Sequence, residues 1–411
     1  MLDPETTRHA DLRDGKGPWR DERLGLPWQT MSDQRCGVLV IGAGITGSLV
    51  AEHLAALGHD ILIIDREGPG EGSTAASTAL LQWEIDKPLA NLAELYGFER
   101  AARIYQRSYK AVQGLCELGL ALPELPGLIR RPTLYLAPET SDARLLELEH
   151  TLRQRADLPG DFLDRQALFD GFRIDRTGAI LSPGSAEVDP LALAHSLLRR
   201  AIASGARLSY GDAHAYEPGS KGTVVEMTNG AVIEAERVVL ATGYVLPDFA
   251  RSPLHSTAAS FVIATAPQSP SLLWRERALI WEASDDYIYA RTTTDGRIVL
   301  GGGDEDCESP DERERLGGAK TIDLEGKLAT LWPGVDNRAA RSWSGAFGKT
   351  TDGLPLIGPV AGYPGMFAAY GYGGNGITFS FMASRMIAAM IAGETRPWFS
   401  DFALDRPDPL A

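Results

Sequence analysis

A short apolar run that leads at once into a glycine-rich turn constrains this chain more than any other feature. Residues 38–41 read Val-Leu-Val-Ile, the continuous apolar run that a buried parallel strand requires. Gly42–Gly47 follow with the pattern G-x-G-x-x-G, and a helical stretch over roughly Ile45–Leu57 leads to a second apolar run, residues 61–64, which ends in Asp65. This spacing predicts an α/β unit that binds a dinucleotide. The alternative is a glycine-rich turn in an α/β protein of another kind.

Each position of the turn has a physical role. The first glycine allows the tight turn, the second lets the backbone approach a pyrophosphate, and the third lets the helix pack on the strand. The helix N-terminus then presents free N–H groups and a positive dipole to the phosphates. Asp65 stands where a carboxylate accepts hydrogen bonds from an adenosine ribose. The cofactor-binding residues expected here are Gly42, Ala43, Gly44, Ile45, Thr46, Gly47, Asp65 and Arg66.

The composition disfavours nucleic acid and anionic membranes as partners and favours a cytoplasmic setting. The 411 residues carry 40 basic and 55 acidic side chains, a formal charge of −15, which argues against nucleic acid or an anionic membrane as the main partner. The three cysteines, Cys36, Cys116 and Cys307, are sparse and widely spaced, which indicates reduced thiols and a cytoplasmic setting. No Cys or His spacing resembles a metal site. Residues 1–35 lack the apolar stretch of a secretory signal, and Glu52 with the glycines of the turn argues against a membrane span.

A third buried strand is predicted over Arg237–Gly243, and it ends in the small residues Ala-Thr-Gly. Such an ending puts open backbone at the carboxyl edge of a parallel sheet, where ligands of this fold class bind. The residues from 255 to 303 read instead as antiparallel strands, with a turn at Asp295-Gly296.

The C-terminal part repeats the signature of a strand followed by a glycine turn. A glycine-punctuated loop over Trp343–Gly358 precedes an apolar strand, Met366–Tyr370, and Gly371–Gly376 opens a long helix to about residue 392. Other segments are predicted as helices over Leu89–Leu118, Ser141–Arg155, Pro190–Ser204 and Ser309–Leu331, and as strands over Thr133–Ala137, Arg207–Tyr210, Thr223–Met227, Ala231–Glu234, Ala259–Thr265, Tyr287–Thr293 and Arg297–Gly301.

The nucleotide-binding elements therefore lie at both ends of the chain, with antiparallel segments between them. This order predicts an α/β fold in which a discontinuous Rossmann-like domain holds the nucleotide and a second domain is inserted into it. The expected parts are an N-terminal extension over 1–35, the nucleotide-binding domain over 36–90, 187–245 and 341–395, the inserted substrate domain over 91–186 and 246–340, and a C-terminal tail over 396–411.

Taken in order, these motifs resemble a known family. The first glycine turn with Asp65, the stretch Gly72–Ala79, the Ala-Thr-Gly ending at 241–243, and the C-terminal stretches Asp352–Gly358 and Gly371–Gly376 resemble the FAD-dependent amino-acid and amine oxidoreductases of the D-amino-acid oxidase type. That family includes glycine oxidase and sarcosine oxidase, and the resemblance covers roughly residues 36–393. It implies an FAD-binding domain with an inserted α+β substrate domain on a mostly antiparallel sheet.

The resemblance also implies how FAD is held. The cofactor would lie extended, with its adenine end at the first glycine turn and its pyrimidine edge at the N-terminus of the last helix, where backbone N–H groups favour negative charge on a reduced flavin. Because the Gly345–Lys349 segment lacks the cysteine that ties flavin covalently in sarcosine oxidase-like members, non-covalent FAD is expected. The further cofactor residues implied are Ser73, Thr74, Ala76, Ser77, Thr78, Ala241, Thr242, Gly243, Gly373, Gly374, Asn375, Gly376, Ile377 and Thr378.

One departure from the family pattern concerns the substrate. Where glycine oxidase-like members carry an arginine that clamps the substrate carboxylate, this chain has Phe347, which cannot form a bidentate clamp. Either another cation, such as Lys349, Arg291 or Arg297, binds the carboxylate, or the substrate has no α-carboxylate. Tyr372 likewise stands where some relatives have histidine.

The candidate catalytic residues each have a plain structural alternative. Tyr289 and Arg291 would share one face of a strand and could hold the substrate's polar groups, unless that face is exposed to solvent. Tyr372 would lie beside the flavin edge, either in a functional role or packed on the ring. Lys349 could stabilise developing superoxide or bind a carboxylate, or could be a surface charge.

The function that this pattern favours is oxidation of a C–N bond. A hydride would pass from the α-carbon of an amino acid, an N-substituted amino acid or an amine to flavin N5, and the resulting imine would hydrolyse. The electron acceptor (oxygen or another carrier) and the oligomeric state stay open. Two alternatives remain: a flavin-dependent hydroxy-acid dehydrogenase, and an FAD-binding partner subunit without catalytic activity.

Overall fold

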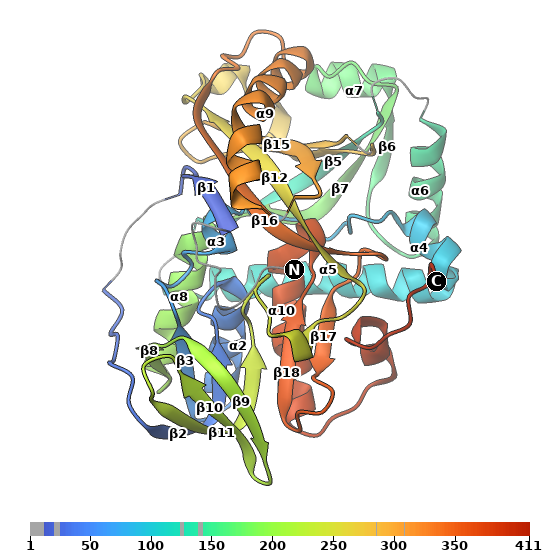
Figure 1. The fold of residues 1–411 in the computed structure, drawn as a ribbon. Helices are drawn as coiled ribbons and strands as arrows, with labels where there is room; N and C mark the ends of the chain where they lie inside the picture. The colour runs from blue at the N-terminus through green and yellow to red at the C-terminus, as the bar shows by residue number, and fades with distance from the viewer. Residues whose placement is uncertain (1–11, 20–24, 124–126, 139–142, 285, 308) are drawn as a thin grey trace.

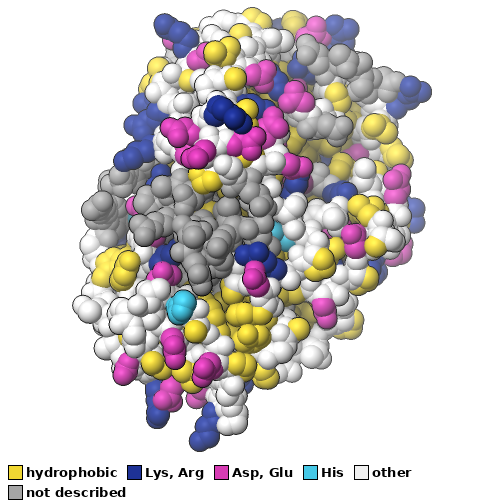
Figure 2. All heavy atoms as spheres, viewed as in Figure 1, with side chains coloured by type: hydrophobic (Ala, Val, Ile, Leu, Met, Phe, Trp, Pro, Cys, Tyr) yellow, Lys and Arg dark blue, Asp and Glu magenta, His cyan; other side chains and the backbone are white. Residues whose placement is uncertain are grey.

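Two β-sheets, each with its own helices, form two lobes of the molecule, as the computed structural model shows (Figure 1). The structure describes residues 12–19, 25–123, 127–138, 143–284, 286–307 and 309–411. Acidic and basic side chains are interspersed on the face drawn in Figure 2. None of the helices in the described part of the chain combines the length and the apolar character that a membrane crossing requires.

The first sheet has parallel strands at its centre. Its order is β17-β18-β11-β2-β3-β8, and the hairpin β9–β10 extends it from β11. β2 lies parallel to both β3 and β11, which explains why its residues 38–41 form a continuous apolar run with both faces covered. The strands are β2 (Gln34–Ile41), β3 (Ile61–Asp65), β8 (Arg207–Tyr210), β9 (Ala213–Gly219), β10 (Gly222–Met227), β11 (Val232–Leu240), β17 (Leu356–Pro359) and β18 (Met366–Tyr370).

Helices α2 (Ile45–Ala56) and α10 (Gly376–Ile391) pack on this sheet, α8 (Pro190–Ala203) packs on α2, and α5 (Phe98–Leu120) packs on α10. Together they bury one continuous apolar core. The strands of the sheet come from three separate stretches of sequence, so this half of the fold is discontinuous along the chain.

The second sheet is antiparallel apart from the pairing of β13 with β5. Its order is β1-β16-β12-β15-β14-β13-β5-β7-β4, with β6 paired to β7. The strands are β1 (Arg13–Gly15), β4 (Leu80–Leu81), β5 (Ile129–Leu136), β6 (Asp161–Asp164), β7 (Gly178–Glu187), β12 (His255–Thr265), β13 (Leu279–Glu282), β14 (Ile288–Thr292), β15 (Ile298–Glu305) and β16 (Ala339–Thr350). The remaining helices are α3 (Ser73–Ala76), α4 (Leu89–Tyr96), α6 (Arg144–Arg155), α7 (Arg165–Phe172) and α9 (Pro310–Leu331), with short 3-10 turns η1 (Asp248–Ala250), η2 (Pro270–Leu272), η3 (Arg275–Arg277), η4 (Gly373–Asn375) and η5 (Pro397–Phe402).

Two local expectations were wrong. The segment from Trp343 to Thr350 is not a loop: it belongs to β16, which pairs with β12 from His255 to Thr265. The long antiparallel partner supplies the backbone hydrogen bonds that make a strand of a glycine-containing stretch. Residues 341–350 therefore lie in the second sheet, so the boundary expected at residue 341 falls after Thr350. The strand expected at Ala231–Glu234 is continuous with the next one as β11.

The described part of the N-terminal extension is fastened to the body. β1 adds to the edge of the second sheet through β16, and Arg313 on α9 donates to Asp14 at 2.8 Å. Arg13 donates to both the backbone and the side chain of Glu71, and the indole of Trp19 donates to the carbonyl of Ser77 at 2.8 Å. The extension therefore lies against the loop that follows β3. Residues 1–11 and the first two residues of the helix expected at Ser141–Arg155 lie outside the described residues.

The C-terminal tail is also anchored. Arg406 forms a two-point ion pair with Asp352, with both nitrogen–oxygen distances at 2.8 Å, and the Tyr96 hydroxyl donates to the same carboxylate at 2.7 Å. Both charged side chains are almost fully buried. All three cysteines are free and buried. Within the described ranges, no group of three or more His, Cys, Asp or Glu side chains could hold a metal ion.

Candidate active site

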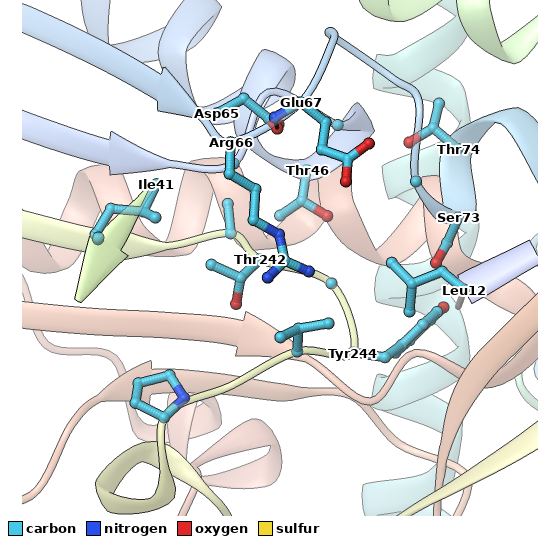
Figure 3. A pocket seen from close by; sticks show the side chains of 18 of the residues that line it. Leu12, Ile41, Thr46, Asp65, Arg66, Glu67, Ser73, Thr74, Thr242 and Tyr244 are labelled. Carbon is cyan, nitrogen blue, oxygen red and sulfur yellow. Dashed lines mark hydrogen bonds between the residues drawn. The ribbon is translucent and has the colours of Figure 1, made fainter. Parts of the chain in front are cut away.

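The carboxyl ends of the first sheet's strands open into a cavity of about 970 Å³ (Figure 3). This volume lies near the upper end of the range for small-molecule sites, about 300–1,000 Å³. Its wall runs from the end of β3, past the glycine turn and the loop with α3, to the start of α10. Leu12 and Tyr244 stand together at one end of it (Figure 3).

The glycine turn has the geometry that its sequence predicts. Gly42 has a φ of 107°, which disfavours other residues, and a Cβ on it would collide with the carbonyl of Ala241. A Cβ on Gly47 would collide with the carbonyl of Gly42. The turn is closed from the side by Thr74, whose hydroxyl accepts a hydrogen bond from the N–H of Ile45 at 3.0 Å. Backbone thus lines this part of the cavity, as the approach of a pyrophosphate requires.

Asp65 ends β3 at the cavity wall. Its two oxygens accept hydrogen bonds from the N–H groups of Ala43, at 2.6 Å, and Glu67, at 2.8 Å. Burial raises the pKa of this carboxyl to about 6, although the two backbone hydrogen bonds act in the opposite direction. Because each oxygen has further acceptor capacity, the carboxylate can still bind ribose hydroxyls. Arg66 and Glu67 line the cavity beside it (Figure 3).

The hydroxyl of Thr242 indicates that a polar ligand fits this cavity. Thr242 lines the wall beyond β11, and its Oγ1 is buried without a hydrogen-bond partner in the described structure. Such an orphaned polar atom requires a partner, because burying it unpaired is costly. The glycine cradle, the carboxylate at the ribose position and this hydroxyl together fit an extended dinucleotide.

Most of the predicted cofactor residues meet in this region. Those that line the large cavity are Gly42, Gly44, Ile45, Thr46, Asp65, Arg66, Ser73, Thr74, Ser77, Ala241, Thr242, Gly243, Gly376 and Ile377. A smaller adjoining cavity is lined by Ala76, Thr78, Gly373 and Gly374. The four that line neither are Ala43, Gly47, Asn375 and Thr378.

The adjoining cavity, which we call the second cavity, has a volume of about 160 Å³ and lies between the two sheets. Strands β12, β13, β14 and β16 supply one side of it, and the η4 turn supplies another. Both cavities share wall residues, namely Ser73, Ser77, Tyr244, Gly376 and Ile377. A small molecule in the second cavity would therefore adjoin a ligand that extends to the start of α10.

Two of the predicted catalytic residues line the second cavity. Phe347 on β16 forms part of its wall, and so does Tyr289 on β14. The Tyr289 hydroxyl lies 2.9 Å from the hydroxyl of Ser260. Burial raises the pKa of Tyr289 well above its usual value, so its phenol stays protonated at neutral pH and is available as a hydrogen-bond donor.

Arg291 is on the same strand but does not line either cavity. Its guanidinium is buried and donates to the carbonyls of Thr78, Ala79 and Val188 at 2.8–3.1 Å. Glu187 lies 3.5 Å away and offsets its charge. The interpretation of Arg291 as a substrate-binding cation was therefore wrong. It holds two of the chain segments through which the fold passes from one sheet to the other.

Lys349 and Arg297 are also engaged elsewhere. Lys349 forms an ion pair with Asp306, and Arg297 donates to Asp295 and to the carbonyl of Thr265. Neither cation lines the second cavity. The structure does not place Lys349 at the site, and its interpretation as a surface charge fits better.

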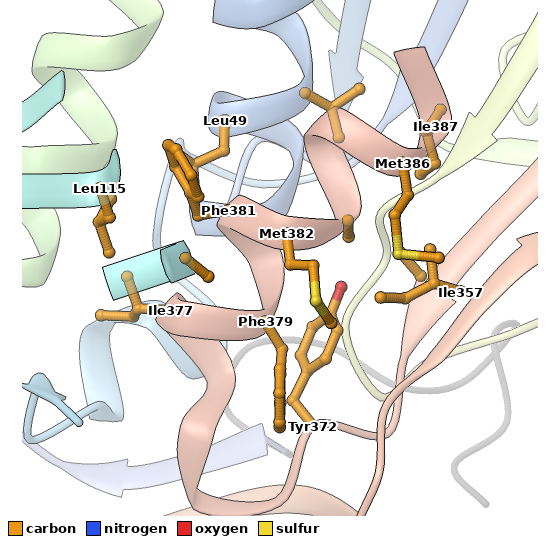
Figure 4. Close-up of a cluster of buried hydrophobic side chains, with 14 of the residues drawn as sticks. Leu49, Leu115, Ile357, Tyr372, Ile377, Phe379, Phe381, Met382, Met386 and Ile387 are labelled. Carbon is orange, nitrogen blue, oxygen red and sulfur yellow. The ribbon is translucent and has the colours of Figure 1, made fainter. Parts of the chain in front are cut away.

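Tyr372 lies in the core of the first lobe. It packs near Phe379 and Met382 of α10 (Figure 4). Its hydroxyl accepts a hydrogen bond from Thr46 at 3.4 Å, and burial raises its pKa well above the usual value. Tyr372 lines the large cavity but not the second one, so its place beside the flavin edge stays a prediction.

Comparison with known proteins identifies the family to which the chain belongs. A model of the family described as FAD dependent oxidoreductase matches residues 37–390. The chain belongs to this family of FAD-dependent oxidoreductases. The flavoenzyme is 27% identical to a D-amino acid dehydrogenase of Rhizobium johnstonii over 87% of its own length and 96% of the relative's. It is 24% identical to the γ-glutamylputrescine oxidoreductase of Escherichia coli over 90% and 86% of the two chains.

Solved structures show the same fold. The crystal structure of glycine oxidase from Geobacillus kaustophilus superimposes with a TM-score of 0.75 at 22% identity, covering 91% of this chain and 99% of that one. The chain is thus an FAD-dependent enzyme whose large cavity fits the cofactor.

Asn375 and Thr378 contribute to this flavoenzyme's site indirectly. The Asn375 amide donates to the carbonyls of Gln82 and Glu84, and the Thr378 hydroxyl donates to the carbonyl of Gln82 at 2.9 Å. Both side chains are buried. They tie the segment after the FAD-binding loop to the start of α10, instead of contacting the cofactor cavity as expected.

The most important residue that sequence reasoning missed is Asp86. It lines the second cavity, and its carboxylate accepts a hydrogen bond from the N–H of Gly374 at 2.6 Å. Burial raises its pKa to about 6. Other polar or aromatic wall residues that were not predicted are Ser260, Trp281 and Tyr287. An acid that follows the loop of α3 by a few residues is only a weak sequence signal for a site residue. The carboxylate reaches the cavity only because η4 packs against this segment.

Proposed function

We propose that this enzyme oxidises a C–N bond of an amine or amino acid bound in the second cavity. The observation that carries the proposal is the shared wall, because five residues line both this cavity and the cofactor cavity. The names of the relatives support the substrate class: one acts on D-amino acids and another on γ-glutamylputrescine. When bound, FAD supplies the acceptor for the hydride removed from the substrate, which carries both electrons.

The chain's own residues would position the substrate and exclude water. Phe347, Trp281 and the tyrosines supply a mostly aromatic wall, and the small volume limits the room for water beside the reacting carbon. The Tyr289 phenol, already paired with Ser260, can donate to a polar atom of the substrate or cofactor. Catalysis here needs orientation and a neutral amine more than a dedicated histidine base.

We also propose that FAD is held without a covalent bond and that the enzyme works in the cytoplasm. No cysteine is among the described residues that line either cavity, which supports the first point. The sparse, buried free cysteines support the second, since disulfides are rare in the cytosol. The electron acceptor is oxygen or another carrier.

The visible spectrum of the purified protein tests this function. We expect flavin bands that denaturation releases into solution and that one class in an anaerobic panel of amines, N-methylamino acids and D-amino acids bleaches. Bleaching by hydroxy acids alone would instead identify a hydroxy-acid dehydrogenase. A protein that cannot be loaded with FAD would contradict the proposal.

A further inference from the structure

We propose that the second cavity selects a substrate that carries an ammonium group apart from the neutral amine that reacts, and that has no carboxylate beside the reacting carbon. This inference rests on the proposed C–N oxidation and names the substrate class of that reaction. The specificity-determining residue is Asp86, which faces the cavity at the turn before α10. A binding measurement tests the preference for a cationic ligand separately from turnover.

Asp86 is the one charged side chain among the described residues of the second cavity's wall. Its side chain lines the cavity, and one hydrogen bond ties the carboxylate in place, from the Gly374 N–H to Oδ2. A carboxylate has about four acceptor sites, so this bond leaves capacity for an ammonium group. The backbone bond also fixes the direction of the charge before any ligand arrives.

A second carboxylate lies behind the wall and adds to the negative potential. Asp304 on β15 accepts a hydrogen bond at 2.6 Å from Tyr287, which does line the cavity. Its other oxygen, Oδ1, is buried without a hydrogen-bond partner in the described structure. Asp304 also raises the pKa of Asp86, whereas Lys349 and Lys320 act to lower the pKa of Asp304 itself. A substrate carboxylate placed here would meet Asp86 directly, which costs free energy unless a cation in the wall offsets the two like charges.

No such cation is present in the described part of the wall. The position that could have held a clamping arginine is Phe347. Lys349 is paired with Asp306, and Arg291 is bound to backbone carbonyls behind the wall. Leaving a carboxylate unpaired in this setting would carry a large desolvation cost, whereas an ammonium would be matched by Asp86.

The aromatic side of the cavity shows independently that a polar ligand belongs there. Trp281 lines the cavity and is only 9% exposed, yet its indole Nε1 has no hydrogen-bond partner in the described structure. Its ring stacks on Tyr135 at 3.8 Å, which fixes its orientation. An orphaned N–H requires an acceptor from the ligand, and the reacting amine nitrogen is one when it is neutral, as distinct from the ammonium group at Asp86. Aromatic faces also attract cations, so this side of the cavity tolerates the ammonium group that Asp86 binds.

A pair of inert ions of the same shape tests the charge preference without turnover. tert-Butylammonium has no hydrogen on the carbon that bears nitrogen, so it cannot be oxidised, and trimethylacetate is its anionic counterpart. We expect isothermal titration of the FAD-loaded enzyme to give a dissociation constant for the ammonium at least about tenfold below that for the carboxylate, which corresponds to about 1.4 kcal/mol. Equal binding, or tighter binding of trimethylacetate, would overturn the inference.

Three variants test which residue causes the preference for the ammonium ion over the carboxylate. Asp86→Asn should abolish it while FAD content stays at the wild-type level, and Asp323→Asn, which removes an exposed acid of α9, should leave it unchanged. Phe347→Arg should reverse it by creating a partner for carboxylates. A preference that survives in Asp86→Asn would assign the selectivity to another group and contradict the role of this residue.

Measurements of turnover distinguish this inference from the proposed C–N oxidation on which it rests. 1,4-Diaminobutane and ornithine differ by one carboxylate, and we expect anaerobic flavin bleaching by the diamine to be at least about tenfold faster at equal concentration. Faster bleaching by ornithine would overturn the inference but support C–N oxidation. Ammonium binding without bleaching by any amine in the panel would sustain the charge preference and contradict the proposed reaction.

Discussion

At the scale of single residues, two kinds of side chain surround the cofactor cavity. Some have their hydrogen bonds completed by the protein, as Asp65 has from two backbone N–H groups. Others, such as Thr242, have a buried polar atom that nothing in the described structure satisfies. The first kind shapes the cavity in the absence of ligand, and the second kind gains a partner when a ligand binds.

Thr242→Val should therefore separate cofactor affinity from stability. Valine keeps the shape and removes a buried hydroxyl that has no partner, so we expect the melting temperature of the FAD-free protein to hold or rise. FAD affinity should fall about twofold to tenfold, the equivalent of one hydrogen bond of about 0.5–1.5 kcal/mol. Fluorescence titration of the FAD-free protein measures the affinity, and Thr228→Val, at another position on the cavity wall, provides a comparison. Unchanged affinity in Thr242→Val would remove this hydroxyl from the cofactor site.

Residue roles could be predicted from sequence where they depend on neighbours along the chain. Gly42, Gly47 and Asp65 belong to one strand-turn-helix-strand unit, and the spacing alone determines their positions. Arg291 could not be interpreted in this way, because its partners at Thr78 and Val188 lie more than a hundred positions away. A buried guanidinium that stabilises backbone and one that binds substrate have the same sequence signal.

At the scale of elements, the short strand β1 extends the second sheet over the cofactor-binding loop. It pairs with β16, and Leu12 just before it forms part of the large cavity's wall. Trp19 and Arg13 then hold the loop of α3 from outside. The sequence did not predict this element, because a three-residue strand has too short a pattern to detect and depends on the edge of β16 for its hydrogen bonds.

Deleting residues 1–19 should weaken FAD retention. The deletion removes the apolar contact of Leu12 and the hydrogen bond to Ser77, so we expect the FAD dissociation constant to rise about tenfold or more, the scale for losing one buried leucine contact of about 1.5 kcal/mol. Gel filtration followed by the ratio of absorbance at 450 and 280 nm measures retention.

Two point variants control for the truncation itself. Leu12→Ala should reproduce part of the loss in FAD retention, and Lys16→Ala, on the same segment but outside both cavity walls, should reproduce none of it. Full FAD retention by the truncated protein would contradict a role for this segment in closing the site.

At the scale of the whole molecule, a buried ion pair fastens the C-terminal tail to the rest of the fold. Arg406 reaches Asp352, in the connection between β16 and β17, from a tail that could have been predicted to be loose. Burial alone would raise the pKa of Asp352, but the two-point contact with Arg406 and the hydroxyl of Tyr96 hold it below the usual value. The pair thus joins the tail to the junction of the two sheets.

The sign of the resulting pH dependence follows from this depressed pKa. The native carboxyl binds its proton at lower pH than the unfolded one, so its stabilising contribution is complete above about pH 4 and is lost as the pH falls through the native pKa. We expect Asp352→Asn to lower the free energy of unfolding by about 3–5 kcal/mol at pH 7, because Arg406 would stay buried without its partner. The difference from the wild type should shrink below about pH 4.

Urea denaturation between pH 3 and pH 7 measures both effects. Asp175→Asn breaks an exposed pair with Arg165 and should change stability little at any pH in this range. A difference between wild type and Asp352→Asn that does not depend on pH would contradict the assignment of the depressed pKa to this carboxyl.

The clamp formed by Arg291 has a consequence for how the two lobes can move. The chain passes between the sheets near Thr78–Ala79 and near Val188, and the same guanidinium binds the carbonyls at both places. The connections β11–β12 and β16–β17 also join the two sheets, and no hydrogen bond from Arg291 reaches them among the described residues. We therefore expect the two clamped connections to stay fixed during the catalytic cycle, so that any movement of one lobe against the other occurs at the remaining ones.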